Sequence, residues 1–281
     1  MYFNTGFSRE YLDFLVFERE IFADLPRVAA CDPMFHRYGE YRFALEMLAF
    51  QPNEIVVDVG CSANLLAFYL AHRLTIVHGI DIEAKVRDWF EAVKSWSCLK
   101  SKKNLRVELL TQDFTRSTLP DHFADKAVAV SSIEHMFSDD GEGDRQAVLQ
   151  ILRILKPGGE AVITVPSSGE GGFHEARSGD SRDGQPYRLY DREAIRDRLL
   201  SDSKIGGVTI KFLAHTTPDP RFTHLTFQKF WLNKLGSEDR KQWSWAYPIL
   251  GEVFNPIISE DEAMERLGTV NTVLIHIKKK C

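Results

Sequence analysis

The segment VVDVGCSAN at residues 56–64 decides the fold. It continues a β-branched run, EIVVDVG (54–60), of the kind found in strands that are buried on both faces. Gly60 ends that run, and a helix is expected from about residue 65. A strand that stops at a glycine before a helix places backbone N–H groups at the carboxyl edge of the sheet, where open α/β sheets bind ligands. We therefore expect a ligand site in the loop at Asp58 and Gly60.

Strands and helices alternate after this segment. Buried strands are expected at 75–82, 105–114, 126–134 and 160–167, and helices at 65–73, 84–97 and 144–156. Pro157-Gly158-Gly159 is expected to stop the last helix. Parallel neighbours need a crossover connection, so this alternation indicates a largely parallel sheet in an α/β fold.

Further segments flank the alternating core. Residues 1–50 are expected to be a helical segment packed on the core, with helices at 8–24 and 38–50. Tyr41, Ala44, Leu45 and Leu48 would line one face of the second helix. We expect the core itself to span 51–215 and 268–281, with a helix at 191–200 and final strands at 204–215 and 269–279.

Two stretches lack this alternating pattern. Residues 168–187 are rich in Gly, Ser, Asp and Arg and are expected to form a loop. Residues 216–267 carry many aromatic side chains, and structureless loops of that length are rare in compact domains. We therefore expect an inserted helical cap with these aromatics: Phe222, Phe227, Phe230, Trp231, Trp243, Trp245, Tyr247 and Phe254.

Composition limits the class of protein. The 281 residues are 44% hydrophobic and 27% charged, which is typical of a globular chain. A net charge of −5 argues against a nucleic-acid or anionic-lipid partner, since phosphate binding favours a basic face. Four scattered cysteines without a CxxC pair indicate reduced thiols, and no apolar run suits a signal peptide or membrane helix. We expect a cytoplasmic protein.

Acidic side chains close the next two strands. Asp81 follows Asp58 by 23 residues, close to where Rossmann-like sites hold ribose hydroxyls. Gln112, Asp113 and Phe114 end the following strand, where a carboxylate can accept from an adenine amine beside an aromatic ring. The alternatives are ordinary ones: Asp58 as a helix cap, Asp81 as a solvated loop acid and Asp113 as a turn residue.

A fourth element completes the set. SSIEHMF (131–137) precedes a helix that ends in LKPGG (155–159), and the strand EAVITVP (160–166) follows. Together with DVGC (58–61) and GID (79–81), this order resembles the class I S-adenosylmethionine-dependent methyltransferases, in particular the type 11 group. The resemblance covers about residues 38–167, with a looser likeness in VLIHIKK (273–279).

The resemblance implies a cofactor, a set of contacts and a topology. S-adenosylmethionine would lie with its methionine part near Asp58, Gly60, Cys61, Ser62 and Ser131, its ribose on Asp81, and its adenine between Ile82, Gln112, Asp113 and Phe114. The fold would be a Rossmann-like three-layer sandwich with a seven-stranded sheet in the order 3-2-1-4-5-7-6 and an antiparallel strand seven. Ser62 and Asn64 stand where further glycines are usual, which leaves the path of the loop open; Asn64 tolerates left-handed geometry.

Methyl transfer is an in-line displacement, so the enzyme mainly has to align donor and acceptor. A hydroxyl acceptor would need a general base. His135, just after the fourth strand of the core, is the expected catalytic residue, since imidazole titrates near neutral pH. His174, Arg188 and Tyr190 are candidate substrate contacts, Arg188 as a clamp for an anionic group; packing is the alternative role for Tyr190.

We therefore expect a methyltransferase that acts on a small molecule, most simply on a hydroxyl of a sugar or secondary metabolite. One alternative is a non-catalytic protein that binds a nucleotide or S-adenosylmethionine. An NAD-dependent reductase would carry a fuller Gly-x-Gly-x-x-Gly run and would leave LKPGG unexplained. Another alternative is an enzyme like the small-RNA 2′-O-methyltransferases, which hold a divalent metal through Glu-x-x-Glu-His. Here Ser131 stands in place of the first glutamate, so we predict no metal. The acceptor and the oligomeric state are not encoded in any motif.

Overall fold

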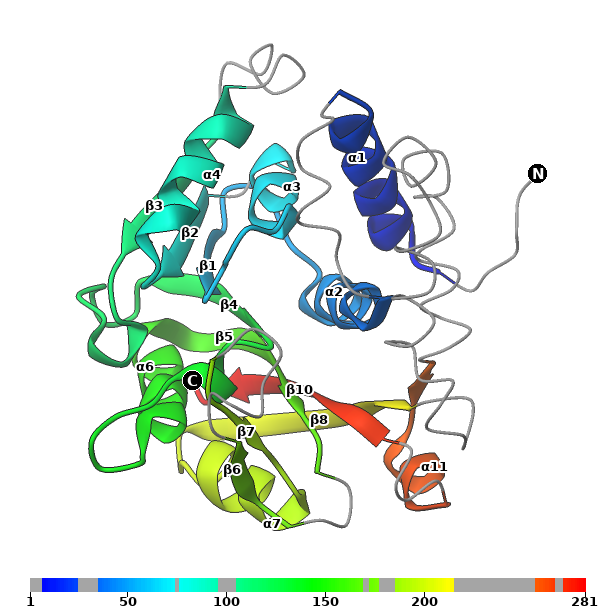
Figure 1. The fold of residues 1–281 in the computed structure, drawn as a ribbon, viewed down its shortest axis with the longest axis vertical. Coiled ribbons are helices and arrows are strands. Elements are labelled where there is room, and N and C mark those ends of the chain that lie inside the picture. The colour runs from blue at the N-terminus through cyan, green and yellow to red at the C-terminus, as the bar shows by residue number, and fades with distance from the viewer. Residues whose placement is uncertain are drawn as a thin grey trace.

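The computed structural model describes residues 7–24, 35–73, 76–95, 105–168, 172–176, 185–214, 256–265 and 270–281. In these ranges the chain forms one eight-stranded sheet with helices on both faces and a separate two-stranded sheet (Figure 1). None of the described helices is both long and apolar enough to cross a membrane.

The large sheet has the order β3-β2-β1-β4-β5-β10-β8-β9. Its first five strands are parallel, whereas β10 runs antiparallel to both β5 and β8. This confirms the predicted order, with β8 and β10 as strands six and seven. The two-residue β9 adds an eighth strand at the edge. The strands are β1 (Ile55–Val59), β2 (Ile76–Asp81), β3 (Val107–Thr111), β4 (Ala124–Val130), β5 (Leu155–Pro166), β8 (Ile205–Ala214), β9 (Ile257–Ile258) and β10 (Val270–Lys279).

The alternation of side chains along β1 assigns the helices to two layers. Successive strand residues point to opposite faces. Val56 belongs to the core shared with helices α1 to α4, whereas Val57 and Val59 belong to the core on the opposite face with α6 and α7. The result is the predicted three-layer sandwich (Figure 1). The helices are α1 (Arg9–Asp24), α2 (Phe35–Leu48), α3 (Leu66–His72), α4 (Ala84–Lys94), α6 (Gly143–Ile154) and α7 (Arg192–Ala194), which continues as a π-helical turn at Ile195–Leu199.

Aromatic contacts fix the N-terminal helices to the core. Phe14 of α1 makes edge contacts with Tyr41 of α2 and Tyr69 of α3, with ring centroids 5.6 and 5.3 Å apart. The Tyr69 hydroxyl also donates to the backbone oxygen of Glu10 at 2.9 Å. The predicted apolar face of α2, including Leu48, is buried. These contacts hold α1 and α2 beside the carboxyl edge of the sheet, where they reach the cavity described below.

Several element boundaries differ from the sequence prediction, most clearly those of β4 and β5; β3 is also shorter than the expected 105–114. Strand β4 ends at Val130, and a short 3-10 helix, η3 (Ile133–His135), follows it where a strand was expected to residue 134. Strand β5 begins at Leu155, immediately after α6, although we expected it at residue 160. The register between β4 and β5 shifts at this irregular start, so the Pro-Gly-Gly stretch extends the strand as well as ending the helix.

The predicted loop at 168–187 contains structure. β6 (His174–Ala176) pairs antiparallel with β7 (Tyr187–Leu189), which makes the two-stranded sheet. The predicted helix after residue 190 does start near Asp191, whose carboxylate accepts from the Ala194 backbone N–H at 2.8 Å. Residues 216–255 and 266–267 of the predicted cap lie outside the described residues. The remainder contains β9 and helix α11 (Glu260–Glu265).

The core between α3 and α4 gives a test of this packing. Phe68 is fully buried and contacts Trp89 and Phe90. Phe68→Ala should lower the free energy of unfolding by about 3–5 kcal/mol, because it leaves a cavity. The measurement is urea denaturation. The control is Val16→Ala, at a site 58% exposed on α1, which should change the free energy of unfolding by less than about 0.5 kcal/mol. A loss below about 1 kcal/mol for Phe68→Ala would contradict the described packing.

Candidate functional site

A cavity of about 630 Å³ opens at the carboxyl ends of the central parallel strands. Its size is in the range of small-molecule sites, about 300–1,000 Å³. Most of the residues predicted for the site line it together, although they come from four different strand ends: Gly60, Ser62, Asp81, Ile82, Gln112, Asp113, Phe114, Ser131 and His135. Asp58 and Cys61 are buried and are not part of its lining.

The loop after β1 is shaped by Gly60. This residue has φ of +65°, and a Cβ placed on it would come 2.4 Å from the Cβ of Ser132 in the loop after β4. The backbone N–H groups of Gly60 and Cys61 both donate to the Ile80 oxygen, at 2.8 and 3.1 Å. Only glycine fits this conformation and this close approach without rearrangement.

The left-handed position after Gly60 is Ser62, with φ of +44°, and not Asn64. The Asn64 side chain instead donates to the Cys61 oxygen and accepts from the Leu66 backbone N–H at 2.9 Å. Asn64 thereby bonds both sides of the turn that leads into α3. The departure from further glycines is therefore accommodated by local hydrogen bonds.

Asp81 is held in a fixed orientation at the cavity wall. Its Oδ2 accepts from the Ser62 backbone N–H at 2.8 Å, and its Oδ1 accepts from the Glu83 backbone N–H at 2.8 Å. A carboxylate has about four acceptor sites, so capacity remains for a diol. Ile82 next to it is 68% exposed, which leaves an apolar surface beside this acid for a flat ring.

The loop after β3 and helix α4 supply polar groups at the same end. Gln112 uses its Oε1 to accept from Thr118, and its buried Nε2 has no partner among the described residues. The buried Nε1 of Trp89 on α4 is also unpaired there. Asp113 caps a short 3-10 helix through Oδ1, which accepts from the Thr115 backbone N–H at 2.9 Å, and still lines the cavity. The donors and acceptors of this end suit a nitrogen heterocycle.

His135 is oriented by the chain before β7. Its Nδ1 lies 2.9 Å from the Pro186 oxygen. A carbonyl oxygen only accepts, so Nδ1 carries the proton, and the neutral ring keeps its lone pair on Nε2. Nε2 lies 3.9 Å from Oε1 of Glu134. The side chain is 36% exposed, and the ring is therefore able to accept a proton from a molecule in the cavity.

Two buried acids next to the cavity lack full hydrogen bonding. Burial raises the pKa of Glu134 to about 8, against the opposing charge of Arg37, and its Oε2 has no partner among the described residues. Burial, with a smaller contribution from the charge of Asp81, raises the pKa of Asp58 to about 7, and its Oδ2 is likewise unpaired. Strongly shifted carboxyl groups of this kind cluster at functional sites.

The N-terminal helices add wall residues that the sequence analysis missed. Glu18 of α1 and Arg37 and Tyr41 of α2 line the cavity. Arg37 stands four residues before Tyr41, on the apolar face predicted for this helix, and a charge on a buried face was the available signal. The loop after β1 contributes Gly60 and Ser62 to the same cavity wall, and η3 contributes His135.

Glu40 holds this part of α2 in place. It is fully buried, and its Oε2 accepts from Nη1 of Arg37 at 2.9 Å. Its Oε1 accepts from the hydroxyls of Ser131 and Thr164, at 2.6 and 3.1 Å. Ser131 itself adopts φ of +41°. One carboxylate thus ties the helix to the ends of β4 and β5.

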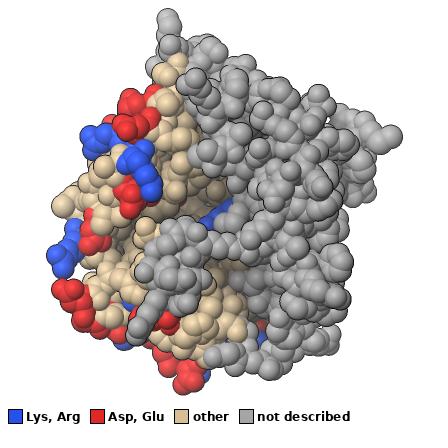
Figure 2. Space-filling model, in the orientation of Figure 1, with Lys and Arg blue, Asp and Glu red and all other residues tan. Residues whose placement is uncertain are grey.

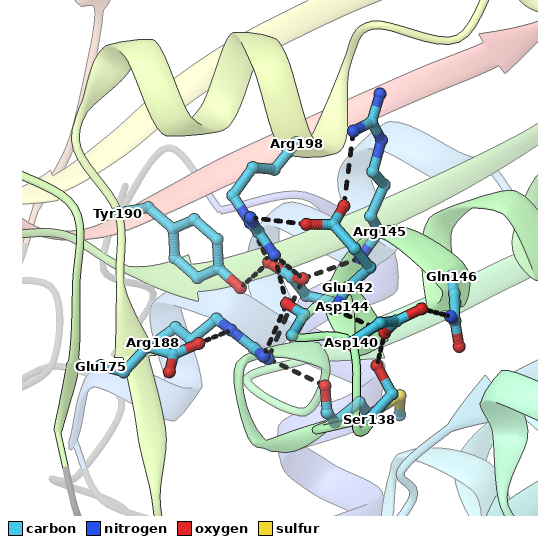
Figure 3. Close-up of polar contacts among 12 residues, drawn as sticks. Ser138, Asp140, Glu142, Asp144, Arg145, Gln146, Glu175, Arg188, Tyr190 and Arg198 are labelled. Atoms are coloured by element: carbon cyan, nitrogen blue, oxygen red, sulfur yellow. Dashed lines mark hydrogen bonds and ion pairs between the residues drawn. The ribbon is translucent and has the colours of Figure 1, made fainter.

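The predicted substrate contacts Arg188 and Tyr190 are structural instead. Both are fully buried, and neither lines the cavity. The Tyr190 hydroxyl donates to Oδ2 of Asp144 at 2.9 Å, and Arg198 binds the same carboxylate (Figure 3). Arg188 donates to Glu175 and to the Met136 oxygen, both at 2.8 Å. A charged residue this deep in the core needs such partners, which is why it has no donor to offer a substrate.

His174 is also remote from the cavity. It lies exposed on β6, with Nδ1 3.4 Å from the Gly172 oxygen, and does not line the described wall. Among the described residues, no group of three or more His, Cys, Asp or Glu side chains could hold a metal ion. On the face shown in Figure 2, basic and acidic side chains of the described residues are interspersed, without a separate basic patch.

Comparisons with known proteins bear on this geometry. Residues 57–163 match the family model described as a methyltransferase domain. That stretch runs from β1 into β5 and so includes the predicted cofactor loops. The match confirms the predicted resemblance to the class I, S-adenosylmethionine-dependent group.

Similar proteins support the same assignment. The chain is 27% identical over 169 residues to phosphoethanolamine N-methyltransferase 3 of Arabidopsis thaliana. The aligned residues cover 57% of this chain and 32% of that enzyme. The chain thus spans about a third of the length of this plant relative.

Solved structures agree on the fold. Phosphoethanolamine N-methyltransferase 2 of Haemonchus contortus, in complex with phosphomonomethylethanolamine and S-adenosylhomocysteine, gives a TM-score of 0.53 at 16% identity, over 86% of this chain and 53% of that one. The [4+2]-cyclase SpnF gives a TM-score of 0.55 at 18% identity, over 85% of this chain and 80% of that one.

The close contact at Gly60 predicts a loss of cofactor binding. Gly60→Ala should weaken S-adenosylhomocysteine binding at least about tenfold, because left-handed alanine costs about 1–2 kcal/mol and its Cβ would displace the loop. Titration calorimetry measures the Kd for S-adenosylhomocysteine. Gly141→Ala is the control, since Gly141 has φ of +75° but open space around it. Equal binding by Gly60→Ala and the parent would show that the loop does not hold the cofactor.

The raised pKa of Glu134 predicts a dependence of stability on pH. The carboxyl titrates at about 4.5 when unfolded and about 8 when folded, so the folded state binds the extra proton between these values. The free energy of unfolding should therefore fall as pH rises from about 4.5 to about 8. Glu134→Gln should reduce this slope in denaturation experiments, whereas Glu91→Gln, at an exposed site, should keep it. An unchanged slope in Glu134→Gln would contradict burial of an unpaired acid.

Proposed function

We propose that this protein transfers a methyl group from S-adenosylmethionine to a small molecule. The observation that carries the proposal is the convergence of Gly60, Asp81 and Gln112 on one cavity within a methyltransferase domain. A cavity of this volume, lined by several strand ends together with α1 and α2, suits a small acceptor better than a long polymer.

The residues present fit the cofactor. Asp81 has spare acceptor sites for ribose hydroxyls, Ile82 offers an apolar face, and Gln112, whose buried Nε2 has no partner among the described residues, lines the same wall. Gly60 leaves space where a side chain would intrude. The bound cofactor supplies an activated methyl group on a sulfonium. The task of the chain is to align the acceptor with that methyl group and to exclude water.

We further propose a hydroxyl acceptor, with His135 as general base. Its Nε2 is the basic nitrogen because Nδ1 donates to Pro186, so a hydroxyl that donates to Nε2 loses its proton there as the oxygen attacks. Glu134 beside it has its pKa raised to about 8 by burial, so it is mostly protonated near neutral pH and places little negative charge next to the ring. Pro186 thereby acts as the positioning group for the base.

An amine acceptor is the second candidate. It is favoured by the relatives, which are named phosphoethanolamine N-methyltransferases. A neutral amine attacks through its own lone pair, so proton removal need not accompany the transfer and His135 would matter less. A cyclisation reaction is a third class of function, because one fold supports different chemistries and a [4+2]-cyclase shares this fold.

Replacement of His135 separates these functions. With a hydroxyl acceptor, His135→Ala should reduce kcat about 10²–10⁴-fold, the usual contribution of a general base, with the Kd for S-adenosylhomocysteine unchanged. The assay is transfer of labelled methyl to a panel of sugars, phenols and amines. His174→Ala, on the hairpin outside the cavity, should leave kcat unchanged.

Three results would revise the proposal. Full turnover by His135→Ala on a hydroxyl acceptor would eliminate the base role. Methylation of amines alone would select the second candidate. Absence of S-adenosylhomocysteine binding in the parent protein would reject methyl transfer altogether.

A further inference from the structure

Two apolar residues follow the proposed general base on the cavity wall. His135 is succeeded by Met136 and Phe137, all three line the cavity, and both apolar side chains are half-buried. Gln185, from the chain that precedes β7, lines the same cavity. An acceptor whose hydroxyl meets His135 therefore has this apolar pair within reach for the rest of its surface.

Arg188 fixes the ring of Phe137. The central carbon of its guanidinium lies over the ring, 3.9 Å from the centroid, which is a cation–π contact. Because the guanidinium occupies one face, the opposite face or the edge of the ring is what Phe137 offers to the cavity. The cation thus restrains the ring from behind.

The same arginine holds the backbone of this segment. Its Nη1 donates to the Met136 oxygen at 2.8 Å, its Nη2 to the Gly141 oxygen at 3.2 Å, and its Nε to Glu175 at 2.8 Å (Figure 3). On its other side the Met136 oxygen lies so close to Gly143 that a Cβ there would collide with it. An acidic partner alone would balance the charge of the arginine. The two bonds to carbonyl oxygens additionally immobilise the segment between them.

This part of the wall suits an aromatic ring better than a sugar. Met136 and Phe137 have no side-chain donor and no strong acceptor, and each guanidinium nitrogen of Arg188 already has a partner. Sugar hydroxyls placed there would lose their water without gaining a hydrogen bond, which is costly. An aromatic ring loses little water and gains an edge or stacked contact with Phe137.

We infer that Phe137 is a specificity-determining residue that selects an acceptor whose hydroxyl is carried by an aromatic ring, and that Arg188 is a positioning residue that acts through Phe137. The inference rests on the proposed function for methyl transfer and for His135, and it names the class of acceptor as phenolic. The acceptor ring lies against Phe137, and its hydroxyl faces Nε2 of His135.

Binding of two matched diols to the full chain, saturated with S-adenosylhomocysteine, tests the inference. Catechol and trans-cyclohexane-1,2-diol carry the same pair of neighbouring hydroxyls, one on a flat aromatic ring and the other on a puckered saturated ring. Calorimetry should give a Kd for catechol at least about threefold lower than for the saturated diol. Phe137→Leu keeps an apolar side chain but removes the ring. It should raise the Kd for catechol about three- to tenfold and leave the Kd values for the saturated diol and S-adenosylhomocysteine unchanged.

Phe173→Leu is the matched control. Phe173 also lies under an arginine of the same network, with Arg198 4.9 Å from its ring centroid, but it does not line the cavity. This variant should bind both diols as the parent does.

A double variant tests the role of Arg188. Arg188→Lys keeps the charge but loses the planar fork, so it should raise the Kd for catechol about threefold. Combined with Phe137→Leu it should raise that Kd no further than Phe137→Leu alone, because the arginine acts through the ring. A purely structural contribution would instead add to the effect of Phe137→Leu.

Several outcomes overturn the inference. Equal Kd values for the two diols in the parent, binding of neither diol, or equal catechol binding by the parent and Phe137→Leu would reject Phe137 as the selecting residue. Additive effects in the double variant would reject the positioning role of Arg188. If the parent does not bind S-adenosylhomocysteine, the proposed function fails, and diol titrations of the cofactor-free chain then decide the Phe137 site separately.

Discussion

The cavity depends on how closely the loops after β1 and β4 approach each other. Gly60 lies against Ser132, and the Ser132 hydroxyl donates to the Val59 oxygen at 2.8 Å. This contact leaves no room for a side chain and sets the spacing of two adjacent strand ends. Because Asp81 bonds to Ser62 in the first loop and Glu40 bonds to Ser131 in the second, both ends of the cavity are built outward from it.

Buried carboxyl groups in this protein fall into two kinds. Glu40 and Asp144 are fully buried and accept from several donors each, so they anchor α2 and the chain around β7. Asp58 and Glu134 each retain an oxygen without a partner among the described residues, and their pKa values are raised by burial. The second kind lies next in the chain to cavity residues, Asp58 two residues before Gly60 and Glu134 directly before His135, and shifted carboxyl groups of this kind cluster at functional sites.

The strand order and much of the cavity wall could be predicted because both follow from local patterns. Alternating strands and helices define a parallel sheet, and the carboxyl ends of neighbouring parallel strands share one edge, which brings Asp81, Gln112 and Ser131 together. Arg37 and Tyr41 could not be predicted as wall residues, because the docking of a helix on a sheet is set by packing far along the chain. Arg188 was misjudged for a related reason: arginine is mostly exposed, and its partner Asp144 stands 44 residues away.

The place of β10 in the sheet has a consequence for biosynthesis. β8 joins the large sheet through β10, apart from its short pairing with β9, and β10 begins at residue 270 whereas β8 ends at residue 214. A ribosome therefore releases β8 well before the strand that links it to β5 has been made. During that interval the nascent polypeptide exposes an unpaired strand edge, which favours aggregation. Chaperone dependence during translation is thus a property to be expected of this topology.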